Sequence, residues 1–148
     1  MIARGTAAAV VLMATTLSSA AAGAGLDEYV WKNRLVLSFV PTSADTRARR
    51  QRDQRRYAPD EWSDRNLLLI EVGPGNRVTV DGRTRVELDA GHLRRRFAVD
   101  TGAYAAILVG KDGGEKLRQA AAIRNGELFD VIDAMPMRRQ EMRRKTGE

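Results

Sequence analysis

The sequence predicts a single α/β domain built on a mixed β-sheet flanked by helices. Two apolar runs, Arg34–Val40 and Leu67–Val72, have the length and near-continuous hydrophobicity of strands that are covered on both faces. The helix-length segment between them favours a parallel pair with a right-handed crossover. A third run, Ala105–Val109, ends at Gly110–Gly114 and is followed by mostly polar residues, which is typical of a hairpin. At 148 residues and 43% hydrophobic content, the chain suits one core.

The segment between the first two strands is expected to form the first helix. Pro41 ends the preceding strand, and either Thr42-Ser43 or Asp45 can cap a helix from about Ala44 to Tyr57. Its apolar stripe is thin, so most of its side chains are expected to face water.

Three further elements follow the second strand. Asp81-Gly82 lies between valines and predicts a minor surface hairpin, and Asp89 can cap a short helix that ends near Phe97. Asn125 is expected to cap a last helix. That helix carries an apolar stripe at i, i+3, i+4 and i+7, made of Leu128, Val131, Ile132 and Met135.

The stretch Leu26–Lys32 is expected to be a short helical lead-in. Its aromatic residues, Tyr29 and Trp31, are expected to pack over one end of the core, because aromatic rings bury a large area. The alternative is a platform on which bases or sugars stack, which usually requires more interleaved aromatic and basic residues than this stretch has.

Residues 1–24 are expected to be a secretory signal peptide. Arg4 gives a short positive segment, residues 7–17 form an apolar stretch, and small residues provide cleavage points before Gly23 or Gly25. The stretch is short for a membrane span, which disfavours an uncleaved anchor. The mature chain is therefore expected to be periplasmic or secreted, with no membrane span.

The chain is basic, with a formal net charge of +6 and a pI near 10.3. Six arginines of the first helix form a candidate anion-binding surface: Arg47, Arg49, Arg50, Arg52, Arg55 and Arg56. Few acids are close to them in sequence, so like charges are expected to repel unless an anion binds. A merely solvated face is the alternative interpretation.

The residue inventory excludes several kinds of chemistry. There is no cysteine, so thiol–disulfide exchange and thiolate metal sites are ruled out. His92 is the single histidine, which leaves no multi-histidine metal site. The glycines of the hairpin turn lack phosphate-loop spacing. No catalytic, cofactor-binding or metal-binding residue is predicted, and no cofactor is expected.

Two other catalytic arrangements have little support from the sequence. A cysteine-independent hydrolase or transferase would use Ser43 with Asp45 and His92, but no motif orients the histidine as a base. Asp130 and Asp133 are expected to be solvated charges on the outer face of the last helix, not an acid/base pair.

The order strand, helix, strand, helix, hairpin, helix is the thioredoxin-like arrangement, here without active-site cysteines. Five segments also resemble domain-of-unknown-function family 4174: Leu26–Tyr29, Trp31–Arg34, Leu93–Phe97, Gly110–Gly114 and Asp133–Arg138. The resemblance implies a thioredoxin-like domain, found alone in exported bacterial proteins and attached to sushi repeats in extracellular animal proteins. It implies no catalytic residues. The arginine-rich first helix departs from a typical member.

The expected organisation is a signal peptide at 1–24, a thioredoxin-like domain at 25–136 and a basic, frayed tail at 137–148. Pro136 ends the last helix and can start another. The tail's cations are Arg138, Arg139, Arg143, Arg144 and Lys145. The favoured function is a non-catalytic, exported binding or structural module; the sequence does not identify its partner, for which an envelope protein and a polyanion are the candidates. The alternative is a polyanion-binding envelope protein that uses the arginine-rich helix.

Overall fold

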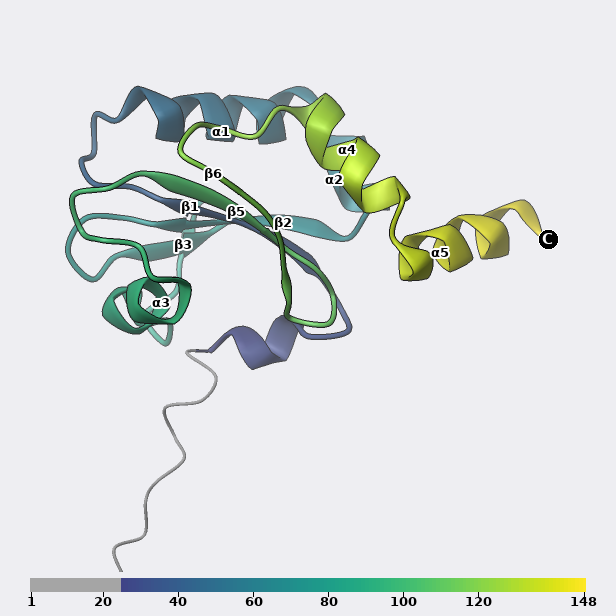
Figure 1. Ribbon diagram of the computed structural model, residues 1–148, viewed down its shortest axis with the longest axis horizontal. Helices are drawn as coiled ribbons and strands as arrows, with labels where there is room; N and C mark the ends of the chain where they lie inside the picture. The colour runs from purple at the N-terminus through teal and green to yellow at the C-terminus, as the bar shows by residue number, and fades with distance from the viewer. Residues whose placement is uncertain (1–24) are drawn as a thin grey trace, which may run out of the picture.

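The computed structural model describes residues 25–148, so the expected signal peptide lies outside the described residues. A six-stranded sheet in the order β4-β3-β2-β1-β5-β6 forms its centre (Figure 1). The strands are β1 (Arg34–Phe39), β2 (Leu67–Val72), β3 (Val78–Val80), β4 (Arg83–Thr84), β5 (Ala105–Val109) and β6 (Glu115–Gln119). The three apolar runs predicted as strands are therefore confirmed, and they occupy the middle of the sheet.

The strand directions follow from the connections. β1 and β2 are parallel, with Leu37 opposite Ile70, as the helical crossover between them predicts. β5 runs antiparallel to β1 and β6 antiparallel to β5, which confirms the Gly110–Gly114 hairpin. All six residues of β1 are buried, whereas β6 is an exposed edge strand. β1 is thus the buried central strand of the domain.

Helices cover both faces of the sheet (Figure 1). The helices are η2 (Leu26–Tyr29), α1 (Thr46–Tyr57), α2 (Pro59–Asp64), α3 (Ala90–Phe97), α4 (Asn125–Asp133) and α5 (Pro136–Thr146). In Figure 1, α1, α2 and α4 lie above the sheet, α3 and η2 lie below it, and α5 extends from the α4 side beyond the sheet. The predicted mixed sheet flanked by helices is confirmed.

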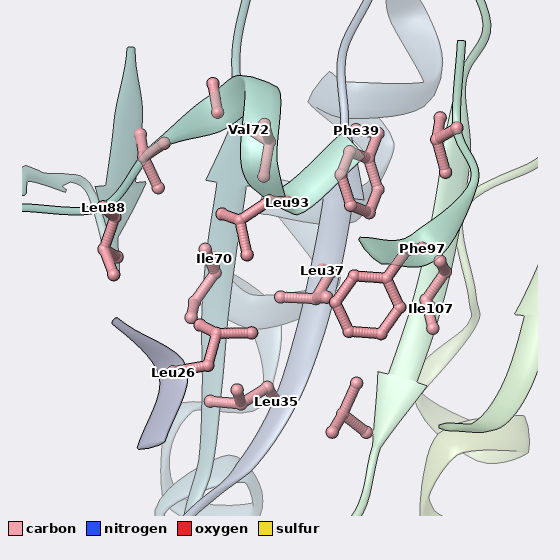
Figure 2. Close-up of a cluster of buried hydrophobic side chains, with 14 of the residues drawn as sticks. Leu26, Leu35, Leu37, Phe39, Ile70, Val72, Leu88, Leu93, Phe97 and Ile107 are labelled. Atoms are coloured by element: carbon pink, nitrogen blue, oxygen red, sulfur yellow. The ribbon is translucent and has the colours of Figure 1, made fainter. Parts of the chain in front are cut away.

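One core layer lies between the sheet and α3 (Figure 2). Leu37 and Phe39 of β1 meet Leu93 and Phe97 of α3, and the rings of Phe39 and Phe97 have centroids 6.1 Å apart. Leu26 of η2 closes one end of the layer. The predicted helical lead-in is therefore part of the core.

The second core layer lies between the sheet and α1, α2 and α4. Trp62, Leu128 and Ile132 are fully buried in it, and Val131 and Met135 pack against it from the side. The apolar stripe predicted for the last helix is confirmed.

The predicted N-cap residues are correct in two cases of three. Asp45 accepts hydrogen bonds from the backbone N–H groups of Arg47 (2.9 Å) and Ala48 (3.4 Å), so α1 begins at Thr46, two residues after the predicted start. Asp89 caps α3 as predicted. The Asn125 cap is wrong: its side-chain oxygen accepts a 2.8 Å hydrogen bond from the indole N–H of Trp62. A buried indole needs an acceptor, and that need takes the asparagine away from capping.

The β3–β4 turn confirms the predicted surface hairpin. Asp81 and Gly82 both have positive φ, 47° and 83°, as a tight hairpin turn requires. The Asp81 carboxylate also accepts a 2.9 Å hydrogen bond from the backbone N–H of Leu69. The turn is therefore tied to β2.

The C-terminal segment differs in part from its prediction. Pro136 starts a further helix, α5, as the sequence allows, but the tail expected to be frayed at 137–148 is helical as far as Thr146. Arg138, expected among the solvated cations, is 2% exposed. Two of its carboxylate partners, Asp64 and Asp133, lie in other elements, and Asp64 is 74 residues away in the sequence.

Candidate functional site

The corner between β1 and α1 is where thioredoxin-type chemistry would take place, and here it carries no thiol. Tyr104 is buried beneath it, with its hydroxyl 3.1 Å from the Ser38 hydroxyl, and burial raises the pKa of Tyr104 to about 12. The hydrogen bond from Arg47 is the main cause that lowers the pKa of Asp45. Neither group changes charge near neutral pH.

The Ser43–His92 arrangement is not assembled. Ser43 is exposed in the loop before α1, and His92 lies in the first turn of α3. No hydrogen bond within residues 25–148 joins the two side chains, and the hydrogen bond given for His92 is made by its backbone N–H to Asp89. The corner therefore pairs no nucleophile with a base.

The six arginines of α1 are less free than the sequence suggests. Four of them form ion pairs: Arg47 with Asp45, Arg52 with Glu71, Arg55 with Asp81 and Arg56 with Asp53. Arg49 and Arg50 are exposed and form no ion pair with any described residue. The expected shortage of nearby acids was wrong, because Glu71 and Asp81 come from β2 and the β3–β4 turn. Whether this surface binds an anion stays a prediction.

Trp31 lies at the other end of β1 and was predicted to be buried. Tyr29 is buried as expected, but the Trp31 side chain is 65% exposed. Its backbone has φ +66°, a left-handed conformation that costs a non-glycine residue about 1–2 kcal/mol. The backbone N–H of Trp31 donates a 2.6 Å hydrogen bond to the carbonyl of Lys111, which holds this conformation against the β5–β6 turn.

The exposed ring borders a groove of about 300 Å³, named here the Trp31 groove. Met135, Pro136 and Met137 form its apolar wall where α4 gives way to α5. Lys111 and Lys116 of the hairpin border its other side. Methionine adapts to different partners and tryptophan supplies a rigid, large contact area, so this lining suits protein recognition.

Buried charges fix the walls of the Trp31 groove. Glu141 of α5 accepts hydrogen bonds from both terminal nitrogens of Arg34 (3.1 and 3.2 Å) and from Lys111 (2.7 Å). Arg34 is 1% exposed and also donates to the carbonyl of Arg65. Burial raises the pKa of Glu141, but the hydrogen bonds from Arg34 and Lys111 outweigh it and leave the pKa below its usual value.

A second set of charges holds the start of α5. Arg138 donates to the carboxylates of Asp64 and Asp133, and Arg65 donates to Asp133 at 2.7 and 3.0 Å. Burial raises the pKa of Asp133, yet these two arginines bring it below the usual value. The prediction that Asp133 is a solvated charge is therefore wrong, whereas Asp130 is exposed as expected.

Three segments far apart in the sequence thus meet at one place. Residues 31–34, 110–116 and 133–138 line the Trp31 groove or hold its walls, with Glu141 between them. These include three of the five segments that carry the family resemblance. The β1–α1 corner, by contrast, contains none of those five segments.

A comparison with protein families identifies the family of this chain. The model of a family described as a domain of unknown function (DUF4174) matches residues 25–141. The chain belongs to this family. The DUF4174 match includes five residues that the sequence assigns to a separate tail, with Glu141 among them, which agrees with the docking of α5 through Glu141.

Curated relatives of this DUF4174 domain are longer animal proteins. The rat sushi repeat-containing protein SRPX is 29% identical over 125 residues, and the mouse and human proteins of that name are each 28% identical. The match covers 82% of this chain but only 27% of each relative. The relatives therefore contain a large part that this chain does not match.

A solved structure confirms the fold. The reduced 2-Cys peroxiredoxin of Plasmodium vivax aligns with a TM-score of 0.54, over 78% of this chain and 84% of that one. Sequence identity is 16%, so the similarity shows the thioredoxin-like fold and not the peroxiredoxin's chemistry. The predicted thioredoxin-like fold without cysteines is confirmed.

Two features of the structure concern membrane insertion and metal binding. No helix among residues 25–148 is long and apolar enough to cross a bilayer. In the same part of the chain, no three histidine or acidic side chains are grouped so that they could hold a metal ion.

The residues that sequence reasoning missed at the Trp31 groove are mainly charged. Arg34 stands at the start of a strand whose other residues are almost all apolar, and an arginine in that position is the one signal that indicates a buried partner. Glu141 gave no such signal, because its partner Arg34 is 107 residues away in the sequence. Trp31 was placed in the core by default, since aromatic residues are usually buried.

Proposed function

We propose that this domain is a non-catalytic binding module that takes up a segment of a partner protein in the Trp31 groove. The observation that carries the proposal is Trp31 itself. Its ring is 65% exposed, and its backbone is held in a conformation unfavourable for tryptophan. An exposed tryptophan with a strained backbone contributes little to the stability of the fold, whereas exposed tryptophans commonly anchor protein interfaces.

The charges around the groove indicate the chemistry of the partner. Each cation of its lining already has a carboxylate partner: Arg34 and Lys111 pair with Glu141, and Lys116 pairs with Asp112. Lys32, next to Trp31, is exposed and forms no ion pair with any described residue. With a net charge of +6 on the whole chain, the partner segment is expected to place an apolar side chain on Trp31 and carboxylates on the rim.

The polyanion alternative has less support from the structure. Four of the six α1 arginines already have carboxylate partners, which leaves Arg49 and Arg50 as exposed cations without one among the described residues. Neither residue lies in the Trp31 groove, so a polyanion would be held on α1 by charge alone, and physiological salt screens that attraction. The partner-protein proposal therefore takes precedence.

Export is part of the same proposal. The pattern of residues 1–24 supports a signal peptide, so the module is expected to meet its partner in the periplasm or after secretion. Mass spectrometry of the envelope fraction is expected to find a mature N-terminus near Gly23 or Gly25. Recovery of the protein with Met1 still attached would contradict this step.

Selection from a displayed library of random peptides tests the binding proposal directly. Peptides enriched on the wild-type domain are expected to combine an apolar residue with flanking Asp or Glu. Their affinity is expected to fall at least about tenfold, or 1.4 kcal/mol, for the Trp31→Gly variant. Glycine suits the left-handed backbone at this position, so the variant is expected to fold.

Tyr57→Ala provides the matched control. Tyr57 is 74% exposed at the end of α1, so this change also removes an exposed aromatic ring but leaves the Trp31 groove intact. It is expected to leave peptide affinity unchanged. If both variants lose affinity equally, or if no peptide is enriched, the Trp31 groove is not the binding site.

A further inference from the structure

A second cavity lies at the opposite end of β1 from the Trp31 groove. It is a cleft of about 380 Å³ on the α1 side of the sheet, over β2 and β3, and is named here the β2–β3 cleft. Its polar lining residues are Ser43, Arg52, Glu71, Arg77 and Thr79, and Leu69 belongs to its apolar part. The cleft lies at the carboxyl ends of the parallel strands β1 and β2, where open α/β sheets commonly bind ligands.

The two arginines of the cleft differ in whether a carboxylate balances their charge. Arg52 donates a 2.7 Å hydrogen bond to Glu71, so its charge is balanced. Arg77 is exposed, and its guanidinium forms no hydrogen bond or ion pair with any residue between 25 and 148. The cleft therefore offers one free guanidinium beside one balanced pair.

A third arginine is buried behind the residues that line the β2–β3 cleft. Arg94 of α3 is 6% exposed, and one of its terminal nitrogens donates to the carbonyls of Val40 (3.2 Å), Val72 (3.4 Å) and Gly73 (3.0 Å). Val40 and Gly73 both line the cleft. The other terminal nitrogen has no hydrogen-bond partner, and Arg94 has no carboxylate partner in the described part of the chain.

This buried cation increases the positive potential at the cleft. Carbonyl dipoles and the Phe39 ring, 5.9 Å from the guanidinium carbon, contact Arg94, but neither supplies a full negative charge. Desolvation by burial lowers the pKa of Arg94 from its usual value, as is expected where no anion compensates the charge. An anion bound in the cleft would be attracted by Arg77 and Arg94 together.

The lining narrows the class of anion. Among the lining residues only Arg77 presents an unbalanced charge, because Glu71 already balances Arg52, and a single charge favours a monoanion over phosphate or sulfate. The planar fork of Arg77 matches the two oxygens of a carboxylate, and the hydroxyls of Ser43 and Thr79 are further donors in the lining. The volume lies near the lower end of small-molecule sites, so the apolar part of the ligand must be short.

We propose that the β2–β3 cleft binds a small organic carboxylate, with its charged group on Arg77 and a short apolar body against Leu69. This site is independent of the Trp31 groove and would be retained if that groove bound nothing. The domain would then have two sites, one for a protein segment and one for a small acid.

Titration with benzoate and butanoate, followed by amide chemical shifts, tests the proposal. Binding is expected to shift the amide signals of Gly73 and Thr79, and Arg77→Gln is expected to weaken it at least about tenfold. The control Arg124→Gln removes another exposed arginine, at the start of α4, and is expected to change affinity less than about twofold. Glu71→Gln is expected to tighten benzoate binding and to admit inorganic phosphate.

Three outcomes would overturn the proposal. Equal affinities of the Arg77→Gln and Arg124→Gln variants would show that the cleft arginine is not the anchor. Phosphate or sulfate bound by the wild type as tightly as benzoate would contradict the choice of a monoanion. Absence of shifts at Gly73 and Thr79 with either carboxylate would mean that the cleft is not a site for them.

Discussion

The helices α1 and α5 are both rich in arginine, and they dock on the domain by different means. α1 buries neutral residues, Ala48 and Gln51, and keeps its arginines at the edges. The Gln51 amide exchanges two hydrogen bonds with the backbone of Ile123, at 3.2 and 2.8 Å. In α5 the buried residue is Arg138, and the helix is held through its carboxylate partners and through Glu141.

This difference shows how a helix without an apolar stripe can still pack. α1 relies on close approach and a satisfied amide, which change little with pH or salt. α5 relies on buried charges whose attraction depends on ionised carboxylates. Since α5 forms one wall of the Trp31 groove, the proposed binding site depends on the more fragile of the two arrangements.

The largest expected effect comes from removing the charge of Glu141. Glu141→Gln leaves the buried Arg34 and the half-buried Lys111 without their counter-ion, and we expect a loss of about 3 kcal/mol in the free energy of unfolding. Arg52→Gln breaks an ion pair on α1 that is substantially exposed, and is expected to cost less than about 1 kcal/mol. Urea denaturation of both variants makes the comparison, and equal losses would mean that α5 is not held by its charges.

A smaller loss is expected from the neutral anchor of α1. Gln51→Met keeps the volume but leaves the backbone N–H and carbonyl of Ile123 without partners, at a cost of about 2 kcal/mol. Gln140→Met, on the exposed side of α5, is the control and is expected to change stability by less than about 0.5 kcal/mol. If the two variants have the same melting temperature, the Gln51 bonds contribute nothing.

Acidification is expected to destabilise α5 before α1. The pKa values of Glu141 and Asp133 are lowered in the folded state, so their contribution is present above the usual pKa values of 4.5 and 3.8 and is lost as pH falls through the lowered ones. Amide exchange is therefore expected to show α5 losing protection in acid before the centre of α1. The lowered pKa of Asp45 limits any early change in α1 to its first turn. Simultaneous loss in both helices would contradict this order.

The sequence predicted what depends on local chemistry and on apolar pattern. The buried strands, the β5–β6 hairpin and the caps Asp45 and Asp89 all follow from residues close together in the chain. Arg34 and Arg138 were missed because their buried state is set by carboxylates that only the fold brings near. The Trp31 groove was missed for the same reason, since its lining comes from three separate segments.

The proposed function requires that Trp31 is exposed for a partner and not for the stability of the fold. Trp31→Gly tests it most directly, with urea unfolding followed by the fluorescence of Trp62, the buried tryptophan that remains. Relief of the left-handed backbone opposes the greater unfolded-state freedom of glycine, so the free energy of unfolding is predicted to stay equal or to rise by up to about 1 kcal/mol. A fall of more than about 1 kcal/mol would show that the Trp31 ring stabilises the domain itself, and would contradict the claim.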